Sequence, residues 1–435
     1  MFSDYQEHGP VLLGDAEYHL RADFRLSNTN VTIANTIRRA VLTQTPSIGF
    51  RTEPYDKSEV NIIVNTTPLV NEMIAHRIGM IPVNADPVSF IPELFTFELD
   101  VENNTKDIID VRAGDFRVYM RNPKNPLDAP IQVDTATIFP PDPITGDTIL
   151  ITRLRPQWNP TAQNERLQVN AKACISSGTE NIRWSPVSQV SYEYTQNMDP
   201  DKLEQVFVKW VQTYKKIDDV AALDVPRREE LIKEFNTMEI KRCFVTDEKG
   251  DPNDFTFHVE SVGVQPIPHI IRNALVSCDV LVTKYQDIDT LIPSNVSVRQ
   301  GDTRYSSIEF IFRNETHTLG NLLANWLIDN EAKDGSQINY AGYTVPHPLR
   351  PEMIVRVGVK EGMDVELQKQ TARSAISKAC KALKNDFRKL TESWTTLVGE
   401  TPVYTGTLPG APIAMPVASE VETKDEEIEA EEITD

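Results

Sequence analysis

Residues that could bind a metal are sparse and scattered along this sequence. The four cysteines are all far apart: Cys174, Cys243, Cys278 and Cys380. No CxxC pair of the kind that binds zinc exists, and this use of cysteine favours a reducing, intracellular setting. His317 and His347 have no cysteine nearby, and we expect each imidazole to satisfy backbone groups in a turn. The sequence therefore predicts no bound metal and no cofactor.

Catalytic motifs are also missing. The sequence has no phosphate-binding P-loop, no GxSxG elbow, no HExxH pair and no tight triad of aspartates that could hold magnesium. Asp287 and Asp289 are two residues apart in a predicted helix, a spacing that points them to different faces. We therefore expect no catalytic residues in this chain.

The polar side chains with the most distinctive spacing lie on two predicted helices. Arg38 and Arg39 flank an apolar helix face, where they are either solvated or paired with carboxylates and carbonyls of a partner. His76 and Arg77 have the same two interpretations, and His76 could instead pair with Glu72 one helix turn away. From these residues alone, both interpretations stay open.

The first of these helices follows a strand. Apolar and polar residues alternate over 18–26, which predicts a half-buried strand, and Asn28 to Asn30 break it. Helical spacing follows and ends near Thr45-Pro46. After a strand over 60–64, Thr67-Pro68 resembles an N-cap with proline at the first helical position, and Gly79 is placed to end that helix in a left-handed conformation.

The later part of the chain is richer in helix. Prolines recur between 82 and 186, which predicts a loop-rich, mostly β domain. We then expect helices within 200–240, a strand from 255, and a helix over 268–289 with an apolar seam. Further strands are predicted at 308–312 and 354–359, a helix over 319–327, and a long helix over 364–398.

The two halves contain a repeat. When Asn28 is placed over Asn314, Phe24 falls on Phe310, and several helix residues coincide: Thr32 with Thr318, Ile33 with Leu319, Asn35 with Asn321, Ile37 with Leu323 and Val41 with Leu327. Both segments are strand, polar turn and helix, and both halves end in a long helix with an apolar seam. The repeat predicts two related halves that pack as a pseudo-symmetric dimer within one chain.

These residues carry a family resemblance. NTIRR at 35–39, NTT at 65–67 and EMIAHRIGMIP at 72–82 resemble the third-largest subunit of eukaryotic RNA polymerase, and its archaeal counterpart and the bacterial alpha subunit share the pattern. WSP at 184–186 and VESVG at 259–263 fit the same subunit. NETHTLGN at 314–321 and AGYTVPHPL at 341–349 resemble the small eleventh subunit, its usual partner.

The resemblance implies a non-catalytic platform that assembles a DNA-directed RNA polymerase. The partners would be the largest and second-largest subunits, with small zinc-bearing subunits nearby, DNA contacted only through the complex, and no membrane. The residues implied to bind the large subunits are Asn35, Arg38, Arg39, Glu72, His76 and Arg77. The residues expected between the two halves are Leu275, Cys278, Val282, Leu319, Leu323, Leu383, Phe387, Leu390 and Trp394.

The chain departs from the family pattern at several positions. Ile37 replaces a leucine, Asn71 replaces an aspartate, and Asn181-Ile182-Arg183 keeps only the last basic residue of the stretch before the tryptophan. Many relatives carry a cysteine-rich metal loop in the inserted domain, whereas this chain has only Cys174 there. We therefore expect the inserted domain to be held together by packing alone.

Charge is concentrated at the C-terminal end. The net charge is −20, and residues 420–435 hold nine carboxylates and one lysine. No basic run exceeds two residues, so a direct grip on nucleic acid is not expected. No stretch of sufficient apolar length to span a membrane occurs, and the N-terminus lacks the features of a signal peptide.

The predicted fold class is α+β, with two pseudo-symmetric alpha-type dimerisation domains, an inserted β-rich domain and a disordered acidic tail. The predicted divisions are these: a first dimerisation segment at 1–84, the inserted domain at 85–195, a helical insertion at 196–250, a second dimerisation segment at 251–292, a linker at 293–305, the eleventh-subunit-like domain at 306–398, and the tail at 399–435.

Two other functions stay open at this point. An acidic scaffold unrelated to transcription would use the same paired helices and would form homo-oligomers. A nucleotide-metabolising enzyme with an unrecognised site would show a substrate-dependent thermal shift. Fusion of the two subunit types resembles what certain large cytoplasmic DNA viruses encode. A viral chain would be expected in the host cytoplasm and the virion, and a cellular one in the nucleus.

Overall fold

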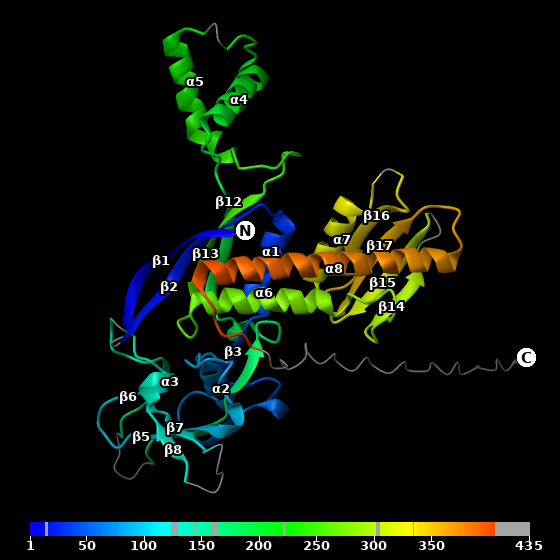
Figure 1. Cartoon of the computed structure of the whole chain (residues 1–435). Helices are drawn as coiled ribbons and strands as arrows, with labels where there is room; N and C mark the ends of the chain where they lie inside the picture. The colour runs from blue at the N-terminus through cyan, green and yellow to red at the C-terminus, as the bar shows by residue number, and fades with distance from the viewer. Residues whose placement is uncertain are drawn as a thin grey trace, which may run out of the picture.

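Two four-stranded antiparallel sheets and a pair of long helices form the body of the molecule, and two insertions extend from it (Figure 1). The computed structural model describes residues 1–13, 16–122, 129–142, 144–157, 163–220, 223–301, 305–333 and 335–404, with side chains outside 9–19. The predicted acidic tail lies outside the described residues from residue 405 onward. Among the described helices, none is both long and apolar enough to cross a membrane.

The first sheet has the strand order β1-β2-β13-β12. Its strands are β1 (Phe2–Leu13), β2 (Ala16–Ser27), β12 (Val187–Tyr194) and β13 (Asp254–Ser261), and the helices α1 (Val31–Thr43) and α6 (Ile267–Thr283) pack against them. Every second residue of β2 from Ala22 to Leu26 is buried, as alternation in the sequence predicts. The buried face of this sheet therefore forms part of the core that the two helices cover.

The second sheet repeats this arrangement with the order β14-β15-β17-β16. Its strands are β14 (Val296–Gln300), β15 (Ser307–Arg313), β16 (Ile338–Thr344) and β17 (Glu352–Val359), and its helices are α7 (His317–Asn330) and α8 (Val365–Val398). The elements follow one another along the chain in the same order as in the first half, with two insertions removed. The predicted mixture of helix and sheet, and the predicted repeat, are both confirmed.

Local geometry matches at equivalent positions of the two halves. Asn28 and Asn314 both have a positive φ, 54° and 61°, at the turn between strand and helix. Two residues later, Asn30 caps α1 through its side chain, and Thr316 caps α7 in the same way. Asparagine adopts the left-handed region more readily than most residues, which explains why both turns use it.

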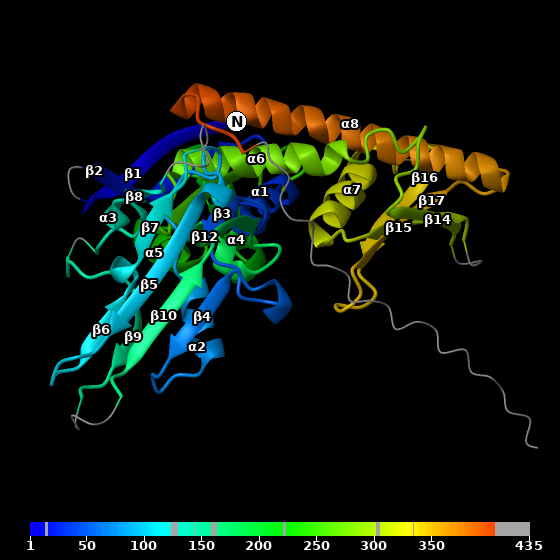
Figure 2. The same cartoon turned by 90° about the horizontal axis from the view of Figure 1, so that it is seen from below.

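The helices α6 and α8 run antiparallel and unite the halves into one core (Figure 2). The indole nitrogen of Trp394 donates to the carbonyl of Pro268 at one end, and Ser377 donates to the carbonyl of Gln286 at the other. The ring of Trp394 lies 5.1 Å from that of Phe24 on β2. The last helix of the second half is thus buried against the sheet of the first.

A separate β-rich unit occupies most of the region between α1 and β12. Its five-stranded sheet has the order β4 (Val60–Asn65), β10 (Arg166–Ala171), β5 (Phe95–Glu102), β7 (Arg117–Met120) and β8 (Ile131–Val133). Two further two-stranded sheets pair β3 (Pro46–Gly49) with β11 (Cys174–Ser177), and β6 (Ile109–Arg112) with β9 (Leu150–Leu154). The unit also contains the helices α2 (Asn71–Gly79) and α3 (Thr135–Ile138). The rings of Phe50, Phe97, Phe116 and Phe139 pack against one another in its own core.

The second insertion lies between β12 and β13 and projects from the body as a helical hairpin (Figure 1). Its helices are α4 (Pro200–Trp210) and α5 (Val225–Met238). Phe207, Trp210, Leu231 and Phe235 form a small core of their own. The helical insertion expected over 196–250 therefore carries its own packing.

The limits of these cores differ from the predicted divisions. Residues 46–84 pack in the core of the β-rich unit rather than in the first dimerisation segment, and β12 pairs with β13 rather than belonging to the inserted domain. The predicted linker at 293–305 contains β14. The predicted tail starts too early, because the backbone N–H of Tyr404 donates to the side chain of Asn273 on α6. An apolar strand does not reveal from its own sequence which sheet it joins.

Two expectations about α2, the position of its start and the conformation of Gly79 at its end, were wrong. The helix begins at Asn71, because Thr67 is held in a turn by the side chain of Asn65. The helix does end at Gly79, but this glycine is not among those with a positive φ. Glycine here instead leaves room for the Arg183 guanidinium and the Thr52 side chain, which a Cβ would crowd.

Candidate assembly interfaces

The polar residues predicted on α1 differ in what they contact. The Nε and Nη2 atoms of Arg38 both donate to the side-chain oxygen of Asn35, at 3.1 and 3.0 Å, on a partly exposed face. Arg39 instead donates from Nε to the hydroxyl of Thr318 on α7, at 2.8 Å. Arg39 therefore joins the two halves of this chain, a contact that sequence reasoning missed, whereas the Arg38 side chain remains on the accessible side of α1.

The residues predicted on α2 also divide into two kinds. Arg77 donates from Nη2 to the carbonyl of Leu150, at 2.8 Å, and from Nε to the carbonyl of Ile151. It therefore ties α2 to β9. Glu72 and His76 are exposed, and among the described residues no hydrogen bond or ion pair joins them. The predicted alternative, in which His76 pairs with Glu72, is therefore not formed in this structure.

An apolar surface accompanies these exposed polar groups on α2. Val70, Met73 and Met80 are each more than half exposed. Methionine is flexible and polarisable, and it is common on surfaces that adapt to a partner. The exposed side chains on and beside α2 therefore include one acid, one imidazole and three apolar groups, which suits this segment to protein contact rather than to chemistry.

The six predicted binding residues do not form one site. Those on α1 lie over the core shared by the two halves, and those on α2 lie over the separate core of the β-rich unit. Any partner that contacts all of them has to span two structural units.

The nine residues predicted between the halves all lie in the shared core. Each is at most 7% exposed: Leu275, Cys278, Val282, Leu319, Leu323, Leu383, Phe387, Leu390 and Trp394. Burial of the thiol raises the pKa of Cys278 far above its usual range. This cysteine is consequently a small apolar packing residue in this structure rather than a reactive group.

A buried polar network at the end of α6 was missed from the sequence. The hydroxyl of Tyr285 donates to Glu315, at 2.8 Å, and the amide of Asn295 donates to the same hydroxyl, also at 2.8 Å. Burial raises the pKa of Glu315, and Lys284, 3.8 Å away, opposes the shift. Tyr285 belongs to the predicted apolar seam, and a hydroxyl buried in such a seam needs a hydrogen-bond partner. That hydroxyl was the one signal of this network in the sequence.

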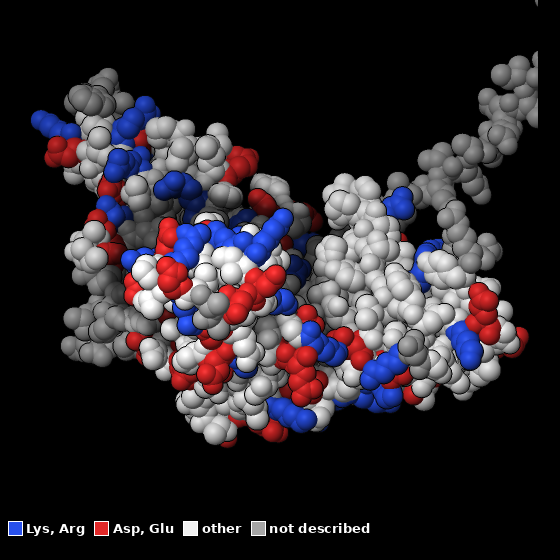
Figure 3. Space-filling view, turned by 90° about the horizontal axis from the view of Figure 1, so that it is seen from above, with Lys and Arg blue, Asp and Glu red and all other residues white. Residues whose placement is uncertain are grey.

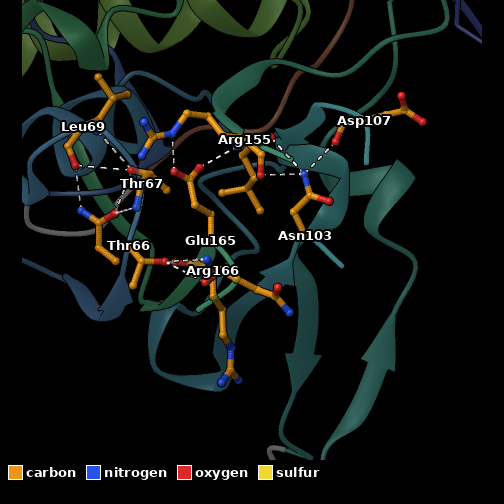
Figure 4. Close-up of polar contacts among 11 residues, drawn as sticks. Thr66, Thr67, Leu69, Asn103, Asp107, Arg155, Glu165 and Arg166 are labelled. Atoms are coloured by element: carbon orange, nitrogen blue, oxygen red, sulfur yellow. Dashed lines mark hydrogen bonds and ion pairs between the residues drawn. The ribbon is translucent and has the colours of Figure 1, made fainter. Parts of the chain in front are cut away.

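The NTT triplet at 65–67 has a structural role at the end of β4 (Figure 4). The side-chain oxygen of Asn65 accepts from the backbone N–H and the hydroxyl of Thr67, and the Thr66 hydroxyl accepts from the backbone N–H of Arg166. Asn103 makes the same turn after β5, with Thr105 in the place of Thr67. These side chains replace backbone bonds that strands lack at their ends, so they shape the rim of the β-rich sheet.

Two models of the RNA polymerase Rpb3/Rpb11 dimerisation domain match this chain, one over residues 23–278 and the other over residues 307–393. The first match alone covers more than half of the chain. The chain belongs to the RNA polymerase Rpb3/Rpb11 dimerisation-domain family. Both matches fall on the two related halves described above, and the first spans both insertions.

Curated relatives agree with this Rpb3-like assignment. The chain is 30% identical over 294 residues to DNA-directed RNA polymerase subunit Rpo3 of Methanopyrus kandleri, covering 64% of this chain and 93% of that protein. It is 26% identical over 299 residues to RNA polymerase II subunit RPB3 of Schizosaccharomyces pombe, covering 64% and 87%. It is 24% identical over 289 residues to the human RNA polymerases I and III subunit RPAC1, covering 58% and 77%.

The β-rich unit of this Rpb3-like chain shows no cluster of ligands. Within the part of the chain that the structure describes, no three His, Cys, Asp or Glu side chains come together in a way that could hold a metal. Burial raises the pKa of Cys174, the cysteine of this unit, to about 11, so its thiolate form is disfavoured. The side chains of this unit pack in a hydrophobic core that includes Phe50.

Proposed function

We propose that this chain is a non-catalytic platform subunit of a DNA-directed RNA polymerase, in which a third-subunit-like half and an eleventh-subunit-like half are fused. The observation that carries the proposal is the pairing of α6 with α8, one helix from each of two related domains in one polypeptide. A pair that ordinarily forms between two chains would here form within one.

Fusion has a physical consequence for assembly. Covalent linkage replaces a bimolecular encounter by an intramolecular one, with an effective concentration of about millimolar. The halves would then be paired before any other subunit binds. The hydrogen bonds from Trp394 to Pro268 and from Arg39 to Thr318 would hold the pair in one orientation.

The proposed partners are the largest and second-largest subunits, with small zinc-bearing subunits adjacent. The accessible Arg38 on α1 and the exposed Glu72, His76 and Met73 on α2 would contribute to docking one large subunit. DNA would be contacted only through the complex.

The experiment is purification of the full chain with an affinity tag from its native source, followed by mass spectrometry of the bound proteins. Both large polymerase subunits are expected. Arg38→Glu should reduce recovery of the second-largest subunit while the chain stays folded, and Arg227→Glu, on the projecting hairpin α5, is the matched control. Absence of both large subunits from the wild-type sample would refute the platform role and favour an acidic scaffold.

The fusion also leads to a proposal about origin. We propose that the chain comes from a large cytoplasmic DNA virus and acts in the host cytoplasm and in the virion. A separate eleventh-type subunit encoded in the same genome would argue against both the fusion and this origin.

A further inference from the structure

The helix α8 is a cationic element in an acidic chain. Residues 365–398 contain seven Lys and Arg and three Asp and Glu, so the helix has a net charge of +4 in a chain whose net charge is −20. Over the charged part of the surface seen from above, acidic and basic side chains are instead intermixed (Figure 3). An anionic segment would therefore be attracted to α8 more strongly than to a surface of mixed charge.

Three basic side chains of α8 lie in a row beside α6. Lys381, Lys384 and Arg388 are spaced three and four residues apart, which places them on one side of the helix. Lys384 donates from Nζ to the amide oxygen of Gln286, at 2.8 Å. The carboxylate oxygens near Lys381 and Arg388 lie 3.7 to 4.0 Å away, beyond the reach of about 2.9 Å for a charge-assisted hydrogen bond. The acidic residues that supply them are Asp279, Asp287 and Asp289. Because both basic side chains are more than half exposed, they can donate to a further acceptor.

The row leads to a hollow where an arginine is incompletely paired. This hollow of about 470 Å³ is lined by Arg272 of α6 and by Arg388 and other residues of the last turns of α8. The Nε and Nη1 atoms of Arg272 are shielded from solvent, and neither has a hydrogen-bond partner among the described residues. Asp279 and Glu392 also line the hollow, but within the described part of the chain no ion pair joins either to Arg272. Shielded cationic donors without acceptors are unfavourable, so an added oxygen would stabilise this site. We call Lys381, Lys384, Arg388 and Arg272 the basic row.

The described chain ends close to the basic row. After α8 ends at Val398, the chain turns back across α6 (Figure 1, Figure 2). The backbone N–H of Tyr404 donates to the side-chain oxygen of Asn273, at 2.9 Å, and Asn273 is only 4% exposed. Asn273 follows Arg272 directly in α6. The residues after Tyr404 therefore start within one helix turn of the basic row.

The acidic segment 420–435 is near enough in the sequence to reach the whole row. Fifteen residues, 405–419, separate it from Tyr404, and this spacer contains no Asp, Glu, Lys or Arg. An extended chain spans at most about 3.5 Å per residue, so the spacer could bridge about 50 Å. The whole of α8 is itself about 50 Å long. Every member of the basic row is therefore within reach of the nine carboxylates of the segment.

We propose that the acidic segment 420–435 docks on the basic row of the same chain. Its carboxylates accept hydrogen bonds from Arg272, Arg388 and the two lysines. Its backbone donates to the Oδ1 atom of Asp279, which is also shielded and without a partner among the described residues. Docking covers the cationic side of α8 and keeps other polyanions away from the helix pair that joins the halves.

Two arguments favour this occupant. A polypeptide supplies both carboxylates for the arginines and N–H groups for Asp279, whereas the phosphates of a nucleic acid supply acceptors alone. The spacer also raises the effective concentration of the acidic segment at the row to about millimolar, which a separate acidic protein lacks. The inference does not depend on the platform role proposed above.

Zero-length cross-linking of the purified full chain tests the proposal. A carbodiimide joins carboxylates to the lysine amines that they touch, and mass spectrometry of a digest identifies the joined peptides. We expect cross-links from 420–435 to Lys381 and Lys384, and their loss in about 1 M salt, where the Debye length is about 3 Å. Lys233 and Lys249 are exposed outside the row and should be joined far less. Equal cross-linking to all four lysines, or cross-links that persist in high salt, would overturn the proposal.

A charge reversal provides the second measurement. Arg388→Glu changes a side chain that is 60% exposed, and it should lower the yield of the cross-links to Lys381 and Lys384 roughly threefold. Arg227→Glu is the matched control, because Arg227 is 49% exposed on α5 and lies outside the row, so the yield should not change. Melting temperatures within about 2 °C of the wild type show that both variants are folded. Equal yields in the two variants would contradict docking on the row.

An isotope mixture identifies the chain to which the segment belongs. Isotopically labelled and unlabelled full chains are mixed in equal amounts before cross-linking. Joined peptides should carry a single label, as expected for docking within one chain. Joined peptides of mixed label would overturn the proposal, because the acidic segment would then bind a second copy.

Discussion

Asp23 and Glu309 occupy equivalent positions in the two halves, 286 residues apart. Each carboxylate is held by two basic side chains from neighbouring strands. The rings of His8 and His258 contact Asp23 at 2.8 and 2.7 Å, and Arg299 and Arg356 donate to Glu309 at 2.7 and 2.9 Å. The repeat therefore extends beyond backbone topology to a bridged carboxylate, with imidazoles in one half and guanidinium groups in the other.

The two bridges should differ in strength. The Glu309 side chain is 6% exposed and that of Asp23 is 35% exposed. We expect Glu309→Gln to lower the free energy of unfolding by about 2 kcal/mol at pH 7, as for a shielded hydrogen bond to a charged group. Asp23→Asn should cost only about 0.5 kcal/mol because solvent screens its pair. Urea denaturation measures both, and an equal cost for the two variants would contradict this ranking.

The same bridges predict how stability depends on pH. Burial acts to raise the pKa of Glu309, but hydrogen bonds from Arg299 and Arg356 outweigh it, and the net pKa is lowered. A lowered folded-state pKa contributes stability above the unfolded value, about 4.3, and loses it as the pH falls through the folded value. The stability difference between wild type and Glu309→Gln should therefore shrink below about pH 4. A difference that stays constant down to pH 2 would contradict this.

The opposite sign applies to Glu315. Its pKa is raised by burial, so ionisation costs stability as the pH rises above the unfolded value of about 4.3. Gln at this position keeps an acceptor for the Tyr285 hydroxyl and cannot ionise. We expect Glu315→Gln to be at least as stable as the wild type at pH 8, and its advantage should fall as the pH approaches 4. Thermal unfolding across this range measures it, with Glu315→Ala, which removes the acceptor, as the destabilised control.

Arg38 and Arg39 should contribute unequally to the stability of the fold. Arg39→Ala removes the contact with Thr318 between the halves, so the free energy of unfolding should drop by about 1 kcal/mol. Arg38→Ala removes only a contact with Asn35 on its own helix, so the loss should stay below about 0.5 kcal/mol. Denaturant unfolding of both variants checks this expectation. A larger loss of unfolding free energy for Arg38→Ala than for Arg39→Ala would contradict the structural role of Arg39.

The repeat suggests a stabilising substitution. Asn325 is the equivalent of Arg39, and Thr32 is the equivalent of Thr318. Thr32 and Asn325 both line a cleft of about 380 Å³ between the two halves. Asn325→Arg should reach Thr32 as Arg39 reaches Thr318, and it should raise the free energy of unfolding by about 1 kcal/mol. Asn325→Met, which introduces an unbranched side chain without donors, is the control, and equal stability of the two variants would contradict the expected hydrogen bond.

The strands and helices of the body follow from local periodicity. The long helix predicted over 364–398 is found at Val365–Val398, with Asp364 as its cap. The equivalence of Asn28 and Asn314 was also visible in the sequence, because a left-handed turn and a helix cap need particular residues at particular spacings. Such features depend on residues a few positions apart, and the sequence by itself determined them.

Contacts between distant residues were decided by the tertiary structure alone. Arg39 looked like a docking residue, yet its partner Thr318 is 279 residues away. The sheet that β12 joins, the two imidazoles that reach Asp23, and the burial of Glu315 against Tyr285 have no local signature either. The physical reason is that periodicity reveals which face of an element is apolar, whereas the identity of the neighbour depends on how the whole chain folds back on itself.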